Sequence, residues 1–127
     1  MKNIGNGRHI IMTNSTLRAW GYYNVLHTVG KHVKLKELTV EPKMCLSMQR
    51  HYERAEFWFV AEGTATVYTL DTATTDHEVK CFLKAHESTF ISANEWHMLC
   101  NESDEPLKLI EIQYGENCVE EDIERKN

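Results

Sequence analysis

Residues 46–60 read LSMQRHYERAEFWFV, and this stretch decides the fold. In a β-strand, side chains two positions apart point to the same face, so Gln49 and His51 face one way and Arg50 the other. Glu56 begins an aromatic and apolar run that is typical of the next strand, after a short polar connection. The stretch therefore predicts two successive strands that carry an amide, an imidazole and a carboxylate.

Short β-branched or aromatic segments separated by turn residues make up most of the chain. Their even spacing indicates an all-β domain of sandwich or barrel type. Residues 62–64 (EGT) have the composition of a hairpin turn. Residues 119–127 are mostly charged, with two apolar residues four apart, which predicts a short C-terminal helix or a tail. We expect strands at 22–26, 33–40, 45–51, 56–62, 64–70, 78–83, 88–91, 96–101 and 107–114.

The length of 127 residues is that of one domain, so we expect a single domain over 1–127 with residues 1–15 as an N-terminal strap or arm. The net charge of −5 argues against nucleic acid or an anionic membrane as the main partner. The apolar stretch near the N-terminus has only three residues, too few for a signal peptide or a membrane span. The four cysteines lie far apart, which indicates neither a redox motif nor a zinc ribbon. We therefore expect a cytoplasmic protein with reduced cysteines.

A second histidine, His97, lies in a later predicted strand. Two imidazoles, one carboxylate and one amide oxygen form a donor set suited to one divalent first-row metal ion, and zinc, manganese, iron, cobalt and nickel are all compatible with it. The set contains no cysteine, which argues against a purely structural zinc site. The alternative is a buried polar network with accidental spacing. Ligands on several strands of a barrel would meet inside it near one mouth, so we predict a metal site formed by Gln49, His51, Glu56 and His97.

These four positions resemble the two motifs of the cupin family. Its first motif has a ligand, one residue, His, three or four residues, Glu, six residues and Gly, and here Gln49, His51, Glu56 and Gly63 match those spacings. The second motif is matched around His97. The resemblance implies a cupin double-stranded β-helix, which is a jelly-roll-like barrel.

A narrower resemblance covers residues 46–58, which are similar to the cupin domain of type II phosphomannose isomerases. Further similar segments extend the resemblance from residue 18 to residue 121. It implies a metal-dependent enzyme of the mannose-6-phosphate isomerase type, which interconverts the aldose and ketose forms of a hexose phosphate. That chemistry removes a proton beside a carbonyl group, and a divalent ion would stabilise the resulting enediolate.

Departures from the family pattern support two alternatives. Glu53 and Phe57 stand where the family generally has histidine, which favours a non-catalytic metal- and sugar-binding cupin that acts as a sensor or accessory protein. A third hypothesis is an iron-dependent cupin dioxygenase. Gln49 at the first ligand position argues against it, because many cupin oxygenases have histidine there.

Several charged residues are candidates for catalysis or substrate binding. Glu53 shares strand parity with His51 and is a candidate general base, the alternative being a solvated loop carboxylate. Lys34 and Lys36 share one strand face. Either one of them binds a phosphate or a substrate hydroxyl near the mouth, or both protect an exposed sheet edge. Arg54, in the connection, is a candidate for bidentate recognition of a phosphate.

Glu111 and Gln113 alternate with Ile110 and Ile112 in a predicted strand. One of the two polar residues lines the pocket, or both belong to an outward polar face, and the pattern does not separate these alternatives. As partners we expect a small-molecule sugar phosphate and a second copy of the chain, since small cupins commonly form homodimers.

Overall fold

The computed structural model describes residues 15–126, which form eleven strands and no helix. None of these residues therefore provides an apolar helix of membrane-spanning length. The strands are β1 (Thr16–Arg18), β2 (Gly21–Val29), β3 (Val33–Val40), β4 (Met48–Arg50), β5 (Arg54–Glu62), β6 (Ala65–Leu70), β7 (His77–Leu83), β8 (Ser88–Ile91), β9 (Met98–Cys100), β10 (Leu107–Gly115) and β11 (Glu124–Lys126).

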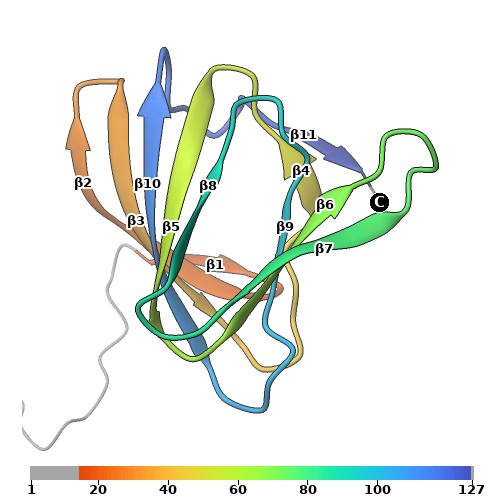
Figure 1. Cartoon of the computed structure of the whole chain (residues 1–127). Helices are drawn as coiled ribbons and strands as arrows, with labels where there is room; N and C mark the ends of the chain where they lie inside the picture. The colour runs from red at the N-terminus through yellow and green to blue at the C-terminus, as the bar shows by residue number, and fades with distance from the viewer. Residues whose placement is uncertain (1–14, 127) are drawn as a thin grey trace, which may run out of the picture.

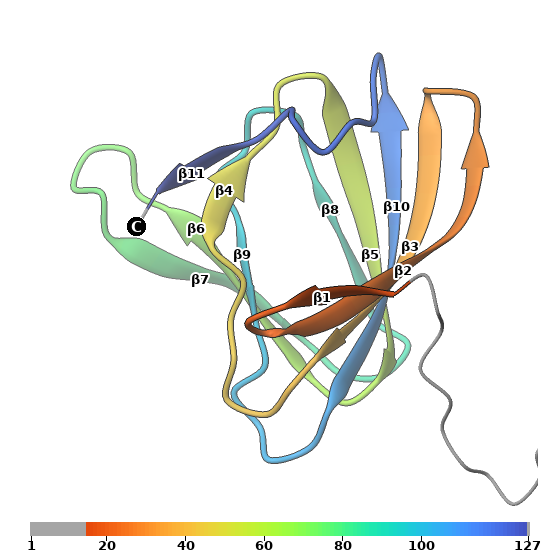
Figure 2. The ribbon, with the colours of Figure 1, turned by 180° about the vertical axis from the view of Figure 1, so that it is seen from behind.

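Two antiparallel layers enclose the core, as Figure 1 shows from the front and Figure 2 from behind. The first layer is a six-stranded sheet in the order β1-β2-β3-β10-β5-β8. The second contains β7-β6-β9 and the pair β11-β4. Backbone β-bridges connect the β4 segment to the β9 segment at Cys45–Cys100 and at Gln49–His97, so these parts form one continuous layer.

Strict alternation along the central strands explains why the chain adopts this barrel. In β5, Trp58 and Val60 are buried, whereas Phe57 and Phe59 lie on the outer face. β10 alternates in the same way. The buried residues of both layers form one apolar core between them. All nine predicted strands are present, and the predicted all-β, jelly-roll-like barrel is confirmed.

Some local predictions were incomplete or wrong, and one is not tested by the described residues. Strands β1 and β11 were not predicted. Residues 62–64 do not form a hairpin turn, because β5 and β6 belong to different layers. Gly63, with φ of +88°, makes the turn between the layers, and a Cβ atom there would lie 2.6 Å from the Pro106 carbonyl oxygen. The N-terminal strap predicted for residues 1–15 falls outside the described residues except for Ser15.

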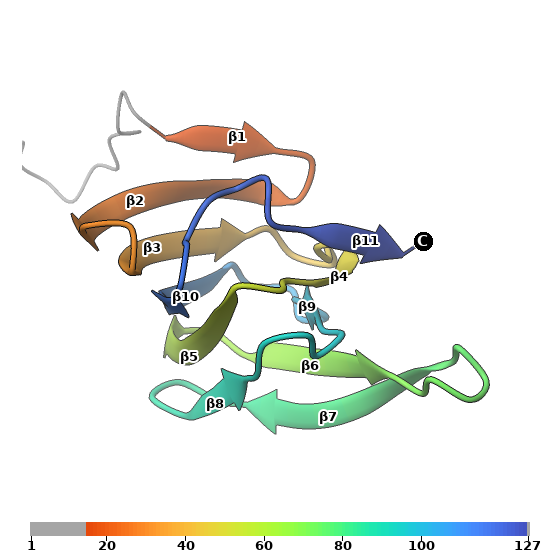
Figure 3. The same ribbon diagram turned by 90° about the horizontal axis from the view of Figure 1, so that it is seen from above.

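The short helix predicted for 119–127 is also wrong over the described residues 119–126. Residues 116–123, called the C-terminal strap below, instead run without regular structure from β10 across one mouth of the barrel to β11 (Figure 3). Tertiary contacts of the strap, described below, replace the backbone hydrogen bonds of a helix.

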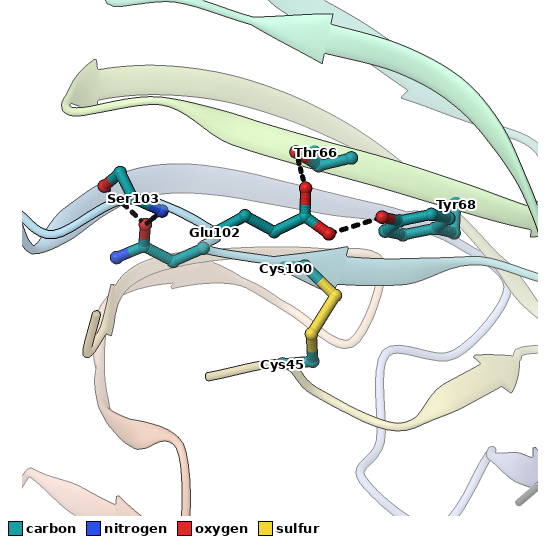
Figure 4. Close-up of a disulfide and its surroundings, with 7 residues drawn as sticks. Cys45, Thr66, Tyr68, Cys100, Glu102 and Ser103 are labelled. Atoms are coloured by element: carbon teal, nitrogen blue, oxygen red, sulfur yellow. Dashed lines mark hydrogen bonds between the residues drawn. A yellow bond between two sulfur atoms is a disulfide. The ribbon is translucent and has the colours of Figure 1, made fainter. Parts of the chain in front are cut away.

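A disulfide joins Cys45 to Cys100, which corrects the prediction that all cysteines are reduced. The backbone bridge between these two residues brings their side chains together across 55 residues of sequence. Figure 4 shows the bond beside the Glu102 carboxylate, which accepts hydrogen bonds from Thr66 and Tyr68. The bond joins the segment before β4 to the end of β9, and these two segments carry the predicted ligands Gln49 and His97 a few residues away.

Candidate metal and substrate site

A cavity of about 280 Å³ lies between the two layers, beside the C-terminal strap. Strands of both layers and the strap supply its walls. It is rich in charged groups, and its aromatic wall consists of Trp20, Tyr23 and Trp58. The lining cations are Arg18, Lys36, Arg54 and Arg125, and the lining carboxylates are Glu56, Glu111 and Glu120.

Three of the four predicted metal ligands line this cavity, and the fourth, His97, lies directly behind them against Glu56. His51 Nε2 lies 3.2 Å from Glu56 Oε2, and His97 Nε2 lies 3.8 Å from Glu56 Oε1. The donor atoms of these three buried residues all lie within 4.8 Å of one another. Gln49 lines the cavity, and its backbone exchanges two hydrogen bonds of 2.9 Å with that of His97. The structure therefore brings all four predicted ligands into one neighbourhood.

Backbone carbonyl groups orient both imidazoles. His51 Nδ1 lies 2.7 Å from the Asp122 carbonyl oxygen, and His97 Nδ1 lies 2.8 Å from that of Glu95. A carbonyl oxygen can only accept, so each Nδ1 carries the hydrogen and each Nε2 has a lone pair that can accept. Both lone pairs are on the nitrogens that approach Glu56.

Both rings are also held neutral, which metal binding requires. Burial is the main reason that the pKa of His51 is lowered from 6.5 to about 4, and the Arg54 charge adds to it. Burial likewise lowers the pKa of His97.

The donor set fits a divalent metal ion. His97 Nε2 is buried and, among the described residues, has no hydrogen-bond partner. An orphan buried acceptor is costly, and a metal ion would satisfy it. Two imidazoles, a carboxylate and an amide oxygen suit first-row divalent ions in general and do not select one of them.

Arg54, a predicted phosphate ligand, lies beside the predicted metal site. Its guanidinium Nε is 3.2 Å from Glu56 Oε2, and its Nη2 is 3.3 Å from His51 Nε2. A metal ion at His51 would compete with the second contact. Nη1 donates to the Val119 carbonyl oxygen at 2.9 Å, so Arg54 also fastens the C-terminal strap.

A second polar group lies on β10. The Trp58 indole donates to Glu56 Oε1 at 2.9 Å and to Glu111 Oε2 at 3.0 Å. Gln113 donates to Glu111 Oε1 at 3.0 Å. Burial, followed by the Glu56 charge, raises the pKa of Glu111 from 4.5 to about 7. Glu111 can therefore exist in both protonation states near neutral pH.

The two predicted lysines meet a carboxylate of the strap. Lys36 Nζ lies 2.8 Å from Glu120 Oε2, and Lys34 Nζ lies 3.3 Å from the same oxygen. Lys36 lines the cavity, whereas Lys34 does not. Burial alone would raise the pKa of Glu120, but the hydrogen bond and charge of Lys36, with those of Lys34, outweigh it and lower the pKa from 4.5 to about 2.

Glu53, the predicted base, is not part of the cavity. Its side chain is exposed, and its backbone nitrogen donates to the Asp122 carboxylate at 2.8 Å. The irregular connection between β4 and β5 breaks the strand parity on which the prediction rested. Phe57 also faces away from the cavity, where it packs edge-on against Phe90.

Several cavity residues were missed or left open by sequence reasoning. The alternation of β10 made Glu111 and Gln113 candidates, and both are buried and line the cavity. Sequence reasoning gave Trp58 no role in the site, yet its indole nitrogen donates hydrogen bonds to Glu56 and Glu111. No local pattern pointed to Glu120 or Asp122, because the strap reaches the site only through tertiary contacts.

The sequence matches the family model described as mannose-6-phosphate isomerase C-terminal over residues 6–127. A mannose-1-phosphate guanylyltransferase of Salmonella muenchen is 41% identical over 108 residues, which are 85% of this chain and 21% of that protein. The alginate biosynthesis protein AlgA of Pseudomonas aeruginosa is 40% identical over 108 residues, with the same coverage of 85% and 21%. The chain therefore spans about a fifth of the length of these curated relatives.

Solved structures resemble the chain in fold. The capsular polysaccharide assembling protein CapF from Staphylococcus aureus superposes with a TM-score of 0.73 at 13% identity, over 87% of this chain and 33% of that one. A Lactobacillus farciminis oxalate decarboxylase gives a TM-score of 0.68 at 17% identity, over 80% and 30%. These neighbours are cupins, and the predicted cupin double-stranded β-helix is confirmed.

Proposed function

Because this chain belongs to the mannose-6-phosphate isomerase C-terminal family of cupins, we propose that it is a metal-dependent isomerase of a hexose phosphate. One observation supports this most directly. The donor set of His51, Glu56 and His97 adjoins a cavity that also contains the cations Lys36 and Arg54. Donors suited to a divalent ion and cations suited to an anionic group therefore lie side by side, which supports the proposal.

In this proposal Gln49, His51, Glu56 and His97 hold one divalent ion. The ion, when bound, supplies Lewis acidity to two neighbouring substrate oxygens. The protein fixes the ligands beforehand, since backbone carbonyl groups already orient both imidazoles.

Proton transfer falls to Glu111 in place of Glu53. Three carboxylates line the cavity, and Glu56 belongs to the metal site while Glu120 is paired with lysine. Glu111 remains, and Trp58 and Gln113 hold its two oxygens in place. A positioned carboxyl that can both accept and return a proton is what an aldose–ketose isomerisation needs.

The loss of two family histidines does not weaken the catalytic proposal. Residue 53 is exposed and residue 57 lies on the outer face of β5, so neither position contributes to the cavity wall. The main sequence argument for a non-catalytic sugar-binding protein thus concerns residues outside the cavity.

An activity assay tests the proposal. Protein stripped with a chelator and reloaded separately with zinc, manganese, iron, cobalt or nickel is expected to convert mannose 6-phosphate to fructose 6-phosphate with at least one ion. His51→Ala is expected to abolish conversion, whereas His27→Ala, on the exposed part of β2, retains it. Full activity of His51→Ala, or no conversion with any ion, contradicts the proposal. Thermal stabilisation by the sugar phosphate without conversion would indicate the non-catalytic alternative. Oxygen consumption by the iron-loaded protein would indicate the dioxygenase.

A homodimer in the cytoplasm is part of the same proposal. On the outer face of the six-stranded sheet, strand register sets Leu35, Ile112, Phe57 and Phe90 side by side, a row suited to a second copy. Gel filtration at two protein concentrations tests the dimer. The Cys45–Cys100 bond argues against the cytoplasm, which keeps thiols reduced. A reduced pair in protein isolated from cells would support the cytoplasmic location, and an intact bond would contradict it.

A further inference from the structure

Lys36 is a lysine in an unusual position, since only 5% of the residue is exposed. Its ammonium group lies 4.0 Å from the centre of the Tyr23 ring and 2.8 Å from Glu120 Oε2. Lys34 Nζ lies 3.3 Å from that same oxygen. Two cations therefore share one carboxylate oxygen beside the cavity.

The partners differ in their freedom to move. Lys36 extends from the central strand β3, and its side chain is 6% exposed. Glu120 lies on the irregular strap, and its side chain is 47% exposed. A buried ammonium group needs an anionic or strongly polar partner at all times, whereas a half-exposed carboxylate can turn to water at small cost. An arriving anion can thus displace Glu120, whereas Lys36 stays in place and pairs with the anion.

We propose that Lys36 is the phosphate-binding residue of this cavity and that Glu120 is an internal competitor which the phosphoryl group must displace. The identity of the phosphoryl ligand as a hexose phosphate rests on the proposed function, whereas the anion site does not. Arg18, which lines the same cavity and approaches the Tyr23 ring, adds positive charge next to it.

Because Glu120 competes for the lysines, an anion occupies the cavity only if its own attraction to the lysines exceeds that of Glu120. Every anion that enters must first separate Glu120 from the two lysines, so all of them bind more weakly by the same factor. A doubly charged phosphoryl group gains about twice the Coulomb attraction of a carboxylate at equal distance, and so overcomes this threshold more readily. Weak singly charged ions then leave the cavity free.

Calorimetry with inorganic phosphate tests the proposal, with the variants Glu120→Gln and Glu121→Gln. Glu121 is an exposed neighbour on the strap and makes no ion pair within the described residues, so its variant changes net charge equally. Glu120→Gln is expected to bind phosphate at least about tenfold more tightly than the unmodified chain, because the competing charge is gone. Glu121→Gln is expected to stay within about twofold, since salt screens an exposed charge.

Two further measurements keep the test decisive. The double variant Lys36→Gln with Glu120→Gln leaves an uncharged pair that can still form a hydrogen bond, and it is expected to lose the gain in affinity. Hydrogen exchange of residues 119–123 is expected to rise on phosphate binding in the unmodified chain and to stay unchanged in Glu120→Gln.

Unchanged or weaker phosphate binding in Glu120→Gln overturns the proposal. So does a double variant that keeps the tighter binding of Glu120→Gln, or the absence of phosphate binding from every variant. Tighter phosphate binding in Glu120→Gln without isomerase activity supports the anion site while the proposed function fails. Isomerase activity without tighter phosphate binding in Glu120→Gln supports the proposed function, while the proposed anion site fails.

Discussion

The backbone carbonyl oxygen of Asp122 lies 2.7 Å from Nδ1 of His51, 71 residues earlier in the chain. The strap at the mouth of the barrel thereby fixes the orientation of a candidate metal ligand. The Asp122 carboxylate strengthens this arrangement, because it accepts hydrogen bonds from the backbone nitrogens of Tyr52 and Glu53 at 2.9 and 2.8 Å.

Asp122→Ala is therefore expected to weaken metal binding although Asp122 is not a ligand. Partners that orient a ligand typically contribute about 10- to 100-fold to metal affinity. Isothermal titration of the chelator-stripped protein with zinc measures the effect. The control is Asp104→Ala, whose side chain is 89% exposed. Equal zinc affinity of Asp122→Ala and the unmodified protein would show that the strap does not support the site.

The raised pKa of Glu111 predicts a specific pH dependence of stability in the metal-free protein. Folding raises this pKa from 4.5 to about 7, so the folded state binds the proton more tightly than the unfolded state. The contribution is fully present below pH 4.5 and is lost as the pH rises to about 7, by at most about 3 kcal/mol.

Denaturant unfolding of Glu111→Gln between these pH values tests this dependence. The difference in free energy of unfolding between the variant and the unmodified protein should change across the window in favour of the variant as the pH rises. Glu121→Gln should show no such trend. A difference that is flat with pH would mean that Glu111 ionises normally.

Much of this site and most of the fold could be predicted from local sequence. Alternation in the segments that became β5 and β10 specified which side chains enter the barrel, because only one register buries their apolar face. The spacing of Gln49, His51 and Glu56 predicted a donor set that the structure brings together with His97.

The C-terminal strap and the disulfide could not be predicted in this way. The charged segment around Glu120 has helical composition, yet its groups bind elsewhere: Val119 accepts from Arg54, and Glu124 pairs with Arg50 at 2.9 Å. These tertiary contacts override weak helix propensity in a short segment. The disulfide was missed for a similar reason, because Cys45 and Cys100 are brought together by strand pairing and not by their spacing in the sequence.

Loss of the Cys45–Cys100 bond is expected to destabilise the protein by up to about 4 kcal/mol, because a closed loop of 55 residues restricts the unfolded chain. Denaturant unfolding of the double variant Cys45→Ser with Cys100→Ser measures this loss. Cys81→Ser, which alters a free cysteine, is the control. If thiol titration of the unfolded, unreduced protein finds four free thiols, the bond does not form in solution.

Solvent deuterium incorporation tests the central claim most directly. Metal-loaded protein is incubated with mannose 6-phosphate in D2O, and the hydrogens at carbons 1 and 2 are followed by NMR. Proton removal from carbon 2 by a residue that exchanges with solvent predicts deuterium at carbon 1 of the fructose 6-phosphate that forms and, through the reverse reaction, at carbon 2 of the mannose 6-phosphate. Glu111→Gln is expected to show neither deuterium incorporation nor product. Saturable, metal-dependent binding of mannose 6-phosphate with no deuterium incorporation and no product would contradict the isomerase and leave a protein that only binds the sugar.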